Sequence, residues 1–295
     1  MPCAELSDIR CYFELLGDGE PLLLIPGLGG TLRLWDPVAP ELAQHFSCIL
    51  ADNRGMGRSI ARRTPKSLND YVSDLVELLD YLQLDKAHVL GVSLGGVIAQ
   101  HLAIDHPSRV DRLVVVSSSN FFTPYLKQMA LLLAQGLRHF KKIDFVRMME
   151  LLATSPQFHD ANAELVEQRV KAKTNNVSRS GLATQLRCLA CSDKSPEQYK
   201  IDAPTLVISG EFDPIIPSCY ARKMASAIPD SRFEMIDGAG HNPLIDEPQR
   251  VVPMIVEFLA GRAELARRAG TARQFPNHSV LGRSECVAAE HDDEG

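Results

Sequence analysis

The stretch Gly91-Val-Ser93-Leu-Gly95-Gly96 decides the fold of this 295-residue chain. It lies between a predicted strand at 87–90 and a predicted helix at 97–104. A serine in so sharp a turn needs neighbours without a Cβ, because the turn brings backbone segments close together. A G-x-S-x-G turn between a strand and a helix exposes the serine hydroxyl and directs the next N–H at a developing oxyanion. Ser93 is therefore a candidate nucleophile.

Predicted strands alternate with helices on both sides of this turn. Strands are expected at 9–16, 22–25, 47–51, 113–116, 205–209 and 232–236, and further helices at 70–84 and 247–259. Strands that alternate with helices imply βαβ crossovers. The expected fold class is α/β, with a mostly parallel central sheet and helices on both faces.

Residues 121–200 break this alternation, because they show helical signals without a strand. We expect a helical lid there, inserted after the sixth strand, between core segments 1–120 and 201–261. The lid carries 12 Lys and Arg against 7 Asp and Glu, although the whole chain has a net charge of −6. This excess is either a solvated basic face or a surface that attracts anionic ligands. Residues 262–295 are expected to form a flexible tail.

The amino-acid composition restricts the binding partners and the cellular compartment that we expect for this chain. A net charge of −6 argues against nucleic acid as the main partner, which requires a basic surface. No apolar run approaches the roughly 18 residues that a membrane span needs, and the N-terminus lacks a secretory pattern. The seven cysteines are scattered, so we expect reduced thiols and a cytoplasmic protein. Cys188 and Cys191 form a CxxC pair without two further zinc ligands nearby, so they are predicted to be core thiols.

A serine nucleophile needs a base and an orienting carboxylate. His241 follows Asp237-Gly-Ala-Gly after the last predicted strand, and such a loop can bring an imidazole across the carboxyl edge of the sheet. Asp213 follows the strand at 205–209 and is the preferred carboxylate, with Glu211 as the nearest competitor. The chain order Ser93, Asp213, His241 is the order expected for this architecture.

Two backbone N–H groups should receive the oxyanion. One is that of Leu94, directly after the candidate nucleophile. The second should come from the loop Pro26-Gly27-Leu28-Gly29-Gly30, where Leu28 N–H is preferred and Gly29 is second. The side chains that either form core or line an apolar substrate pocket are Trp35, Phe121, Phe122, Leu126 and Met129, and Gly29 is a further pocket candidate.

Three further sequence motifs contribute to a resemblance between this chain and a known family. They are Asp52-Asn-Arg54-Gly-Met-Gly57-Arg-Ser59, His106-Pro-Ser-Arg-Val110 and Pro204-Thr-Leu-Val-Ile-Ser-Gly210. Over roughly residues 5–260 the chain resembles the α/β-hydrolase fold superfamily, and within it the branch of 3-oxoadipate enol-lactonases and small carboxylesterases. Pro26 departs from the pattern, since many members carry His there, but the group that acts at this loop is a backbone N–H.

The resemblance implies a serine hydrolase of a small carboxylic ester or lactone, monomeric or homodimeric, without a metal or organic cofactor. The basic lid adds the expectation that the substrate is anionic. One alternative is a hydrolase that cleaves the C–C bond of a vinylogous diketone with the same three residues. Another is a ligand-binding receptor that has lost turnover.

Overall fold

A nine-stranded sheet forms the centre of the computed structural model, which describes residues 3–120 and 123–264. The strands are β1 (Cys3–Glu5), β2 (Ile9–Leu16), β3 (Glu20–Ile25), β4 (Phe46–Ala51), β5 (Ile60–Ala61), β6 (Ala87–Val92), β7 (Val110–Val116), β8 (Thr205–Gly210) and β9 (Ser231–Ile236). Their order is β1-β2-β4-β3-β6-β7-β8-β9, with β5 beside β2. All pairs from β4 to β9 are parallel, whereas β2 runs antiparallel to β1, β4 and β5. The predicted mostly parallel sheet is confirmed.

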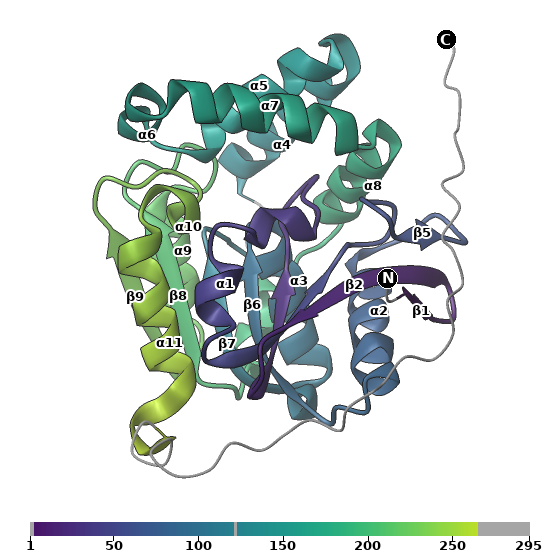
Figure 1. Cartoon of the computed structure of the whole chain (residues 1–295), viewed down its shortest axis with the longest axis vertical. Coiled ribbons are helices and arrows are strands. Elements are labelled where there is room, and N and C mark those ends of the chain that lie inside the picture. The colour runs from purple at the N-terminus through teal and green to yellow at the C-terminus, as the bar shows by residue number, and fades with distance from the viewer. Residues whose placement is uncertain (1–2, 121–122, 265–295) are drawn as a thin grey trace.

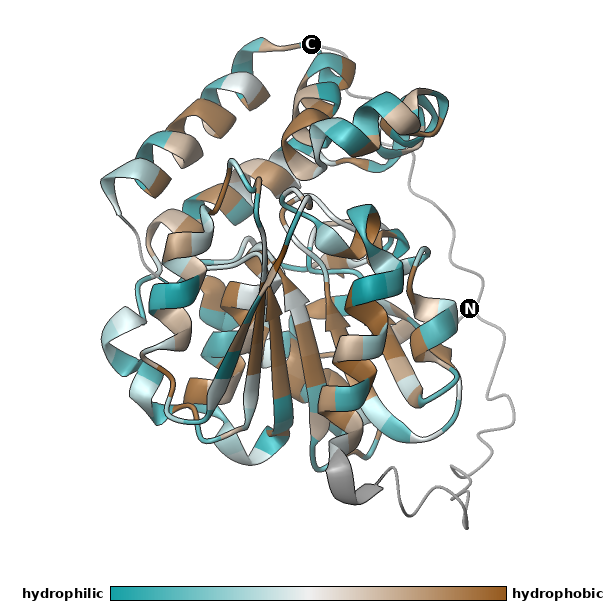
Figure 2. Ribbon diagram, turned by 90° about the vertical axis from the view of Figure 1, so that its left-hand side faces the viewer, coloured by the Kyte–Doolittle hydropathy of each residue, from teal (hydrophilic) through white to brown (hydrophobic). Residues whose placement is uncertain are grey.

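Helices cover both faces of this sheet (Figure 1). One face carries α2 (Leu68–Tyr81), α3 (Leu94–Asp105) and α9 (Ser218–Ala225), and the other carries η1 (Leu32–Trp35), α1 (Ala39–Leu42) and α11 (Pro248–Glu264). Alternate residues of one strand enter opposite cores: Leu23 and Ile25 pack under α2 and α3, while Leu22 and Leu24 pack under α1 and α11. Because both faces are buried, the central strands are mostly apolar (Figure 2).

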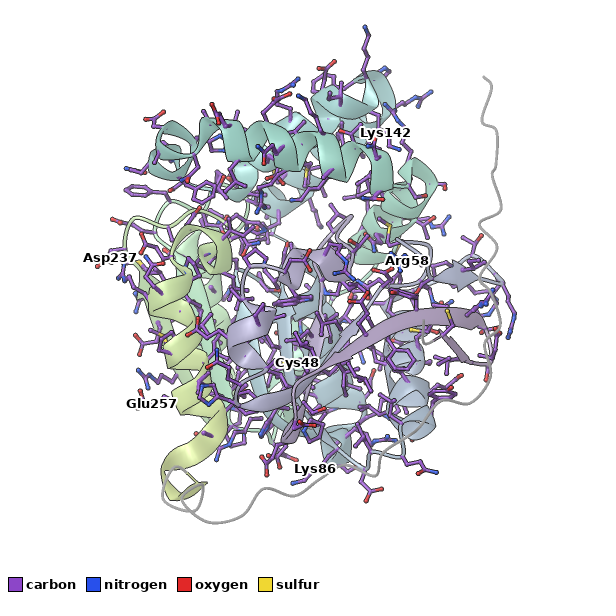
Figure 3. All side chains as sticks on the ribbon, viewed as in Figure 1. Cys48, Arg58, Lys86, Lys142, Asp237 and Glu257 are labelled. Carbon is purple, nitrogen blue, oxygen red and sulfur yellow. The ribbon has the colours of Figure 1, made fainter. Side chains whose placement is uncertain are left out.

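Between β7 and β8, the described residues form five helices. They are α4 (Pro124–His139), α5 (Lys142–Ala153), α6 (Pro156–Ala161), α7 (Ala163–Asn176) and α8 (Arg179–Ala190), followed by the 3₁₀ turn η3 (Ser195–Lys200). The segment follows β7, which is the sixth strand along the chain when the two-residue β5 is left aside. It lies over the carboxyl ends of the strands, whereas Lys86, just before β6, lies at the opposite end of the molecule (Figures 1 and 3). In the part of the chain that the structure describes, no helix is long and apolar enough to span a membrane.

We call the segment from α4 to η3 the lid. Side-chain caps fix where two of its helices begin, and one buried ion cluster joins two of them. Thr123 and Ser155 accept hydrogen bonds from backbone N–H groups three residues ahead, so they fix where α4 and α6 begin. Inside the lid, the almost fully buried Glu150 binds Arg169 and Lys173 of α7. Burial opposes ionisation of Glu150, but the two cations outweigh it and hold its pKa below the usual value. This ion cluster joins α5 to α7.

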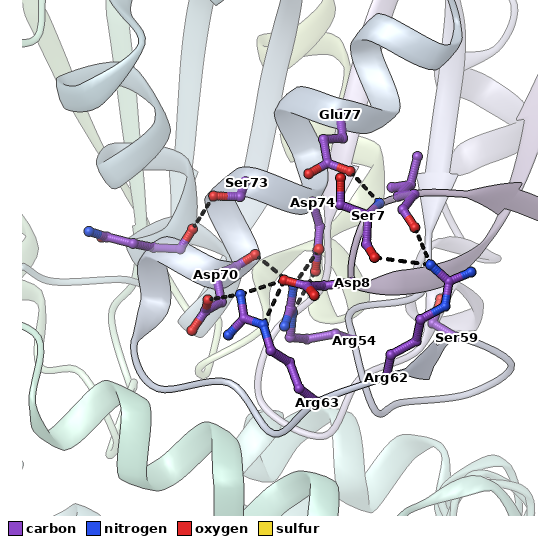
Figure 4. A network of polar contacts seen from close by, with 12 residues as sticks. Ser7, Asp8, Arg54, Ser59, Arg62, Arg63, Asp70, Ser73, Asp74 and Glu77 are labelled. Carbon is purple, nitrogen blue, oxygen red and sulfur yellow. Dashed lines mark hydrogen bonds and ion pairs between the residues drawn. The ribbon is translucent and has the colours of Figure 1, made fainter.

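A second buried ion pair anchors the loop after β4 to α2 (Figure 4). Arg54 Nε and Nη2 donate to the two carboxylate oxygens of Asp74, at 2.6 and 2.5 Å. Arg54 also donates to the carbonyl oxygen of Asp70 and lies over the ring of Tyr71. The side chains of Arg54 and Asp74 are only 1% and 9% exposed, and burial raises the pKa of Asp74 to about 6 although Arg54 opposes the shift. Each charge therefore depends on its partner.

Removal of one member of the Arg54–Asp74 pair should lower the free energy of unfolding more than removal of both members. Asp74→Leu leaves the Arg54 guanidinium buried and unpaired, and we expect the free energy of unfolding to fall by about 3–5 kcal/mol. The double variant Arg54→Met, Asp74→Leu should recover much of this loss in urea denaturation. Glu197→Ala, which breaks an exposed pair with Lys200, is the control and should change stability by less than about 1 kcal/mol. A double variant as unstable as Asp74→Leu would contradict the prediction.

Candidate active site

Ser93 occupies a strained backbone conformation between β6 and α3. Its φ is 55° and its ψ is −119°, a region that residues with a Cβ rarely adopt. The two flanking glycines have no space for a side chain, because a Cβ on Gly91 would lie 2.3 Å from Gly95 O and one on Gly95 would lie 2.0 Å from Ile25 O. The turn therefore has the geometry of a nucleophile elbow. Among the described residues, Ser93 Oγ forms no hydrogen bond.

Two backbone N–H groups beside Ser93 have no acceptor among the described residues. Leu94 N–H stands at the N-terminus of α3, where the helix dipole favours negative charge. Leu28 N–H belongs to the loop after β3, and this loop lies close to Ser93, since a Cβ on Gly27 would be 3.2 Å from Ser93 Cβ. By contrast, Gly29 N–H donates to Gln185 Oε1 of the lid at 2.8 Å. Of the two predicted donors in this loop, Leu28 therefore remains available.

Asp213 and His241 form a buried pair at the ends of neighbouring strands β8 and β9. His241 Nδ1 lies 2.8 Å from Asp213 Oδ2, and the two side chains are 8% and 0% exposed. Asp213 Oδ1 accepts the backbone N–H groups of Ile215 and Ile216, at 2.9 and 2.8 Å. A carboxylate held in this way accepts a hydrogen bond from Nδ1–H, which leaves Nε2 of the imidazole with its lone pair.

Glu211, the competing carboxylate, has a different position. It is exposed, and its Oε2 accepts the backbone N–H of Gly238 in the loop that carries His241. Glu211 thus supports the loop and does not contact the imidazole. The loop and β8 approach very closely, since a Cβ on Gly210 would lie 1.9 Å from Gly240 O.

A cavity between sheet and lid joins Ser93 to these elements. Its walls include Ser93, Leu94 and Leu28, and also Ile215 and Ile216, whose N–H groups hold the Asp213 carboxylate. The remaining lining residues are Val97, Ser118, Ser119, Asn120, Leu126, Met129, Ala130, Leu133, Leu186, Leu189 and Ser192. No charged side chain lines the cavity among the described residues.

The predicted pocket residues divide into four groups. Leu126 and Met129 line the cavity, whereas Phe121 and Phe122 lie outside the described residues. Trp35 forms core and does not line the pocket. The turn η1 directs its indole into the core between the sheet, α1 and α11, on the face opposite to α3, where it is fully buried. Gly29 lies against the lid, since a Cβ there would meet Leu182 at 2.7 Å.

The predicted core thiols are only half correct. Cys188 is buried and donates to Pro65 O, but Cys191 at the end of α8 is exposed.

Another serine of the cavity wall, Ser192, pairs with a histidine. Ser192 Oγ lies 2.8 Å from Nε2 of the buried His101, which is on α3. Burial lowers the pKa of His101 to about 4, and no hydrogen bond holds its Nδ1. An imidazole with so low a pKa and no orienting carboxylate on Nδ1 is a poor general base near neutral pH. This pair therefore serves as an internal comparison for Ser93 and His241.

The lid contacts the loop of His241 through Asp246, in the short helix α10 (Pro243–Asp246). Asp246 Oδ2 accepts Gly240 N–H at 2.6 Å and Ser155 N–H at 3.1 Å. Asn242 N–H donates to Ala153 O at 2.6 Å. Burial raises the pKa of Asp246, although the two backbone donors oppose the shift. Neither Asp246 nor Gln185 was identified from the sequence, since their roles depend on which loops the lid reaches.

One group of possible metal ligands lies far from this site. Glu20, His88 and Asp111 stand at the amino ends of β3, β6 and β7, with ligand atoms within 4.8 Å of one another. His88 Nε2 is 3.0 Å from Glu20, its Nδ1 is 3.3 Å from Asp111, and Lys86 pairs with Asp111. The group is therefore a charge network at the edge of the sheet opposite to Ser93.

Sequence comparison identifies the family. A model described as the α/β-hydrolase fold matches residues 20–248. The chain therefore belongs to the α/β-hydrolase superfamily, as its elbow, its sheet and its helical insertion indicate.

Similar proteins include several hydrolases. A proposed carbamate hydrolase, RutD of Azorhizobium caulinodans, is 29% identical over 247 residues, which are 82% of this chain and 91% of the relative. The structure of a thermophilic esterase from Thermogutta terrifontis superposes with a TM-score of 0.79 at 26% identity, over 88% of this chain and 98% of the esterase. An enol-lactonase from Burkholderia xenovorans LB400 has a TM-score of 0.81 at 23% identity, over 88% and 100%, which shows a shared fold.

Loss of the Asp246 carboxylate should weaken the site without touching Ser93. Asp246→Ala leaves Gly240 N–H and Ser155 N–H buried without an acceptor, at a cost of about 1–3 kcal/mol for each group. We expect lower thermal stability and a lower kcat, because the loop of His241 loses its support. Asp246→Asn keeps one amide oxygen as acceptor, so its kcat and Tm should fall between those of wild type and Asp246→Ala. Equal kcat values for all three proteins would exclude this role.

His101 should make stability depend on pH. Its folded pKa of about 4 lies below the ordinary 6.5, so between these values the unfolded chain binds a proton that the folded chain does not. The free energy of unfolding should therefore fall by up to about 3 kcal/mol as the pH drops from about 6.5 to about 4. In His101→Gln this fall should be smaller, whereas the exposed control His139→Gln should keep it. Denaturant titrations at several pH values measure the difference, and identical pH slopes in all three proteins would refute the assignment.

Proposed function

We propose that this chain is a serine hydrolase that cleaves a small carboxylic ester or lactone through an acyl-enzyme. His241 Nε2 takes the proton of Ser93 Oγ as that oxygen attacks the carbonyl carbon. The oxyanion accepts hydrogen bonds from Leu94 N–H and Leu28 N–H. His241, now cationic and held by Asp213, returns the proton to the leaving alcohol, and water then repeats the cycle on the acyl-enzyme.

The observation that carries this proposal is the buried Asp213–His241 pair beside a cavity that also contains a strained serine. Backbone strain of this kind costs on the order of 1–3 kcal/mol and persists where the surrounding structure enforces it. The strain at Ser93 is explained if it positions Ser93 Oγ to reach a substrate carbon. No metal or organic cofactor takes part in this mechanism.

The comparisons support the class of reaction. The esterase and the proposed carbamate hydrolase are both hydrolases by name, and each is more than 25% identical to this chain. We favour an ester or lactone over the C–C bond of a vinylogous diketone and over ligand binding without turnover, because the Asp213–His241 pair and both free N–H groups fit acyl transfer. An anionic substrate, a cytoplasmic location, a monomeric or homodimeric state and the absence of nucleic-acid and membrane partners stay predictions from the sequence.

Substitution of Ser93 tests the proposal. Wild type should hydrolyse p-nitrophenyl acetate, butyrate or octanoate, and Ser93→Ala should lower kcat by about 10³-fold or more. Ser192→Ala is the matched comparison, because this serine borders the same cavity and pairs with the other histidine. Its kcat should stay within about tenfold of wild type, since it loses one hydrogen bond and no reacting atom. Equal activity of Ser93→Ala and wild type would disprove the mechanism.

A further inference from the structure

Asn120 lines the cavity, and its amide group has no hydrogen-bond partner among the described residues. It follows β7 by four residues and is 3% exposed. Neither its Oδ1 nor its Nδ2 has a hydrogen-bond partner among residues 3–120 and 123–264. A buried donor or acceptor left unsatisfied costs about 1–3 kcal/mol, so folded proteins rarely retain one without a reason.

The neighbouring polar side chains of the cavity are engaged elsewhere. Ser118 Oγ donates to the backbone oxygen of Ser93 at 2.8 Å, and Ser192 pairs with His101. Most of the remaining wall is apolar, with leucine and isoleucine side chains from the lid and from the loop after β8. Asn120 is therefore a polar residue with an unpaired amide in the wall of a mainly apolar cavity, and ligand sites commonly use such a residue to orient the ligand.

We infer that Asn120 is a specificity-determining residue, which selects substrates whose acyl chain ends in a carboxamide or a carbamoyl group. Such a group presents a carbonyl oxygen and an N–H on one edge. It can therefore accept from Asn120 Nδ2 and donate to Asn120 Oδ1 in a paired arrangement. Hydrocarbon chains of the same shape leave both atoms of Asn120 unsatisfied, so the site discriminates against them. The inference rests on the proposed acyl transfer at Ser93, because the cavity then holds the acyl chain.

Matched isosteres provide the test. The p-nitrophenyl esters of 4-carbamoylbutanoate and 5-methylhexanoate differ only in that a carboxamide replaces an isopropyl group. Asn120→Leu makes the same exchange on the protein. We would measure kcat/KM of both esters, after subtraction of spontaneous hydrolysis, with wild type, Asn120→Leu and the exposed control Asn176→Leu.

The preference for the carboxamide ester over the branched ester should be stronger in wild type and Asn176→Leu than in Asn120→Leu. The ratio of the two kcat/KM values should shift by about 10- to 100-fold toward the branched ester in Asn120→Leu, because one net hydrogen bond corresponds to roughly a tenfold effect. The Tm of Asn120→Leu should equal or exceed that of wild type, since the substitution removes two unsatisfied buried atoms. An unchanged ratio, or an equal loss for both esters with a lower Tm, would overturn the inference.

Calorimetry separates this inference from the proposed function. Ser93→Ala should bind ethyl 4-carbamoylbutanoate more tightly than ethyl 5-methylhexanoate, and addition of Asn120→Leu or Asn120→Ala should remove the preference. If no ester is hydrolysed but this preference is present, the proposed function fails and the role of Asn120 stands. If esters are hydrolysed and Ser93→Ala binds both ethyl esters equally, the role of Asn120 fails and the proposed function stands.

Discussion

The close approach of backbone to backbone around Ser93 is the constraint on which the rest of the site depends. Gly91 lies against Gly95, and Gly95 lies against Ile25, with no space for a Cβ at either glycine. Ser93 N–H donates to Val116 O at 2.9 Å, so β7 also holds the strained turn in place. The strain is thus supported from β3 and β7, the two strands that pair with β6. Any side chain at Gly95 would separate Ser93 from the loop that offers Leu28 N–H.

The same kind of contact extends from the sheet to the lid. Gly240, next to His241, approaches Thr154 and Ser155 so closely that a Cβ would lie 2.7 Å from Ser155 N. Gly29 touches α8, where Gln185 binds its N–H. The lid therefore contacts both the loop of the candidate base and the loop of the candidate oxyanion donor. A shift of the lid would move two of the elements that surround Ser93, so substrate entry and the geometry of the site are physically linked.

Local patterns explain which parts of the structure the sequence predicted. The elbow at Ser93 and the loops of Asp213 and His241 are recognisable because glycines and apolar strands beside them follow from local backbone demands. The short strands β1 and β5 and the helices α1 and α9 carry no comparable pattern and were not predicted. Trp35 follows the oxyanion loop in sequence, but its direction depends on the turn η1. The roles of Asn120 and Asp246 follow from partners distant in sequence, which no local pattern encodes.

Cationic side chains of the lid lie in a groove outside the cavity at Ser93, where we expect the substrate to be selected. The cationic side chains Lys127, Arg138, Arg179 and Arg187 line a groove between α4 and α8, with no carboxylate among the described residues of its wall. The cavity at Ser93, by contrast, contains no charged side chain in its described lining. Charges outside a cavity act over about 10 Å and favour the approach of an anion, but salt screens them. Selection beside Ser93 must therefore come from shape and from short-range hydrogen bonds, and the unpartnered amide of Asn120 is placed to make such bonds.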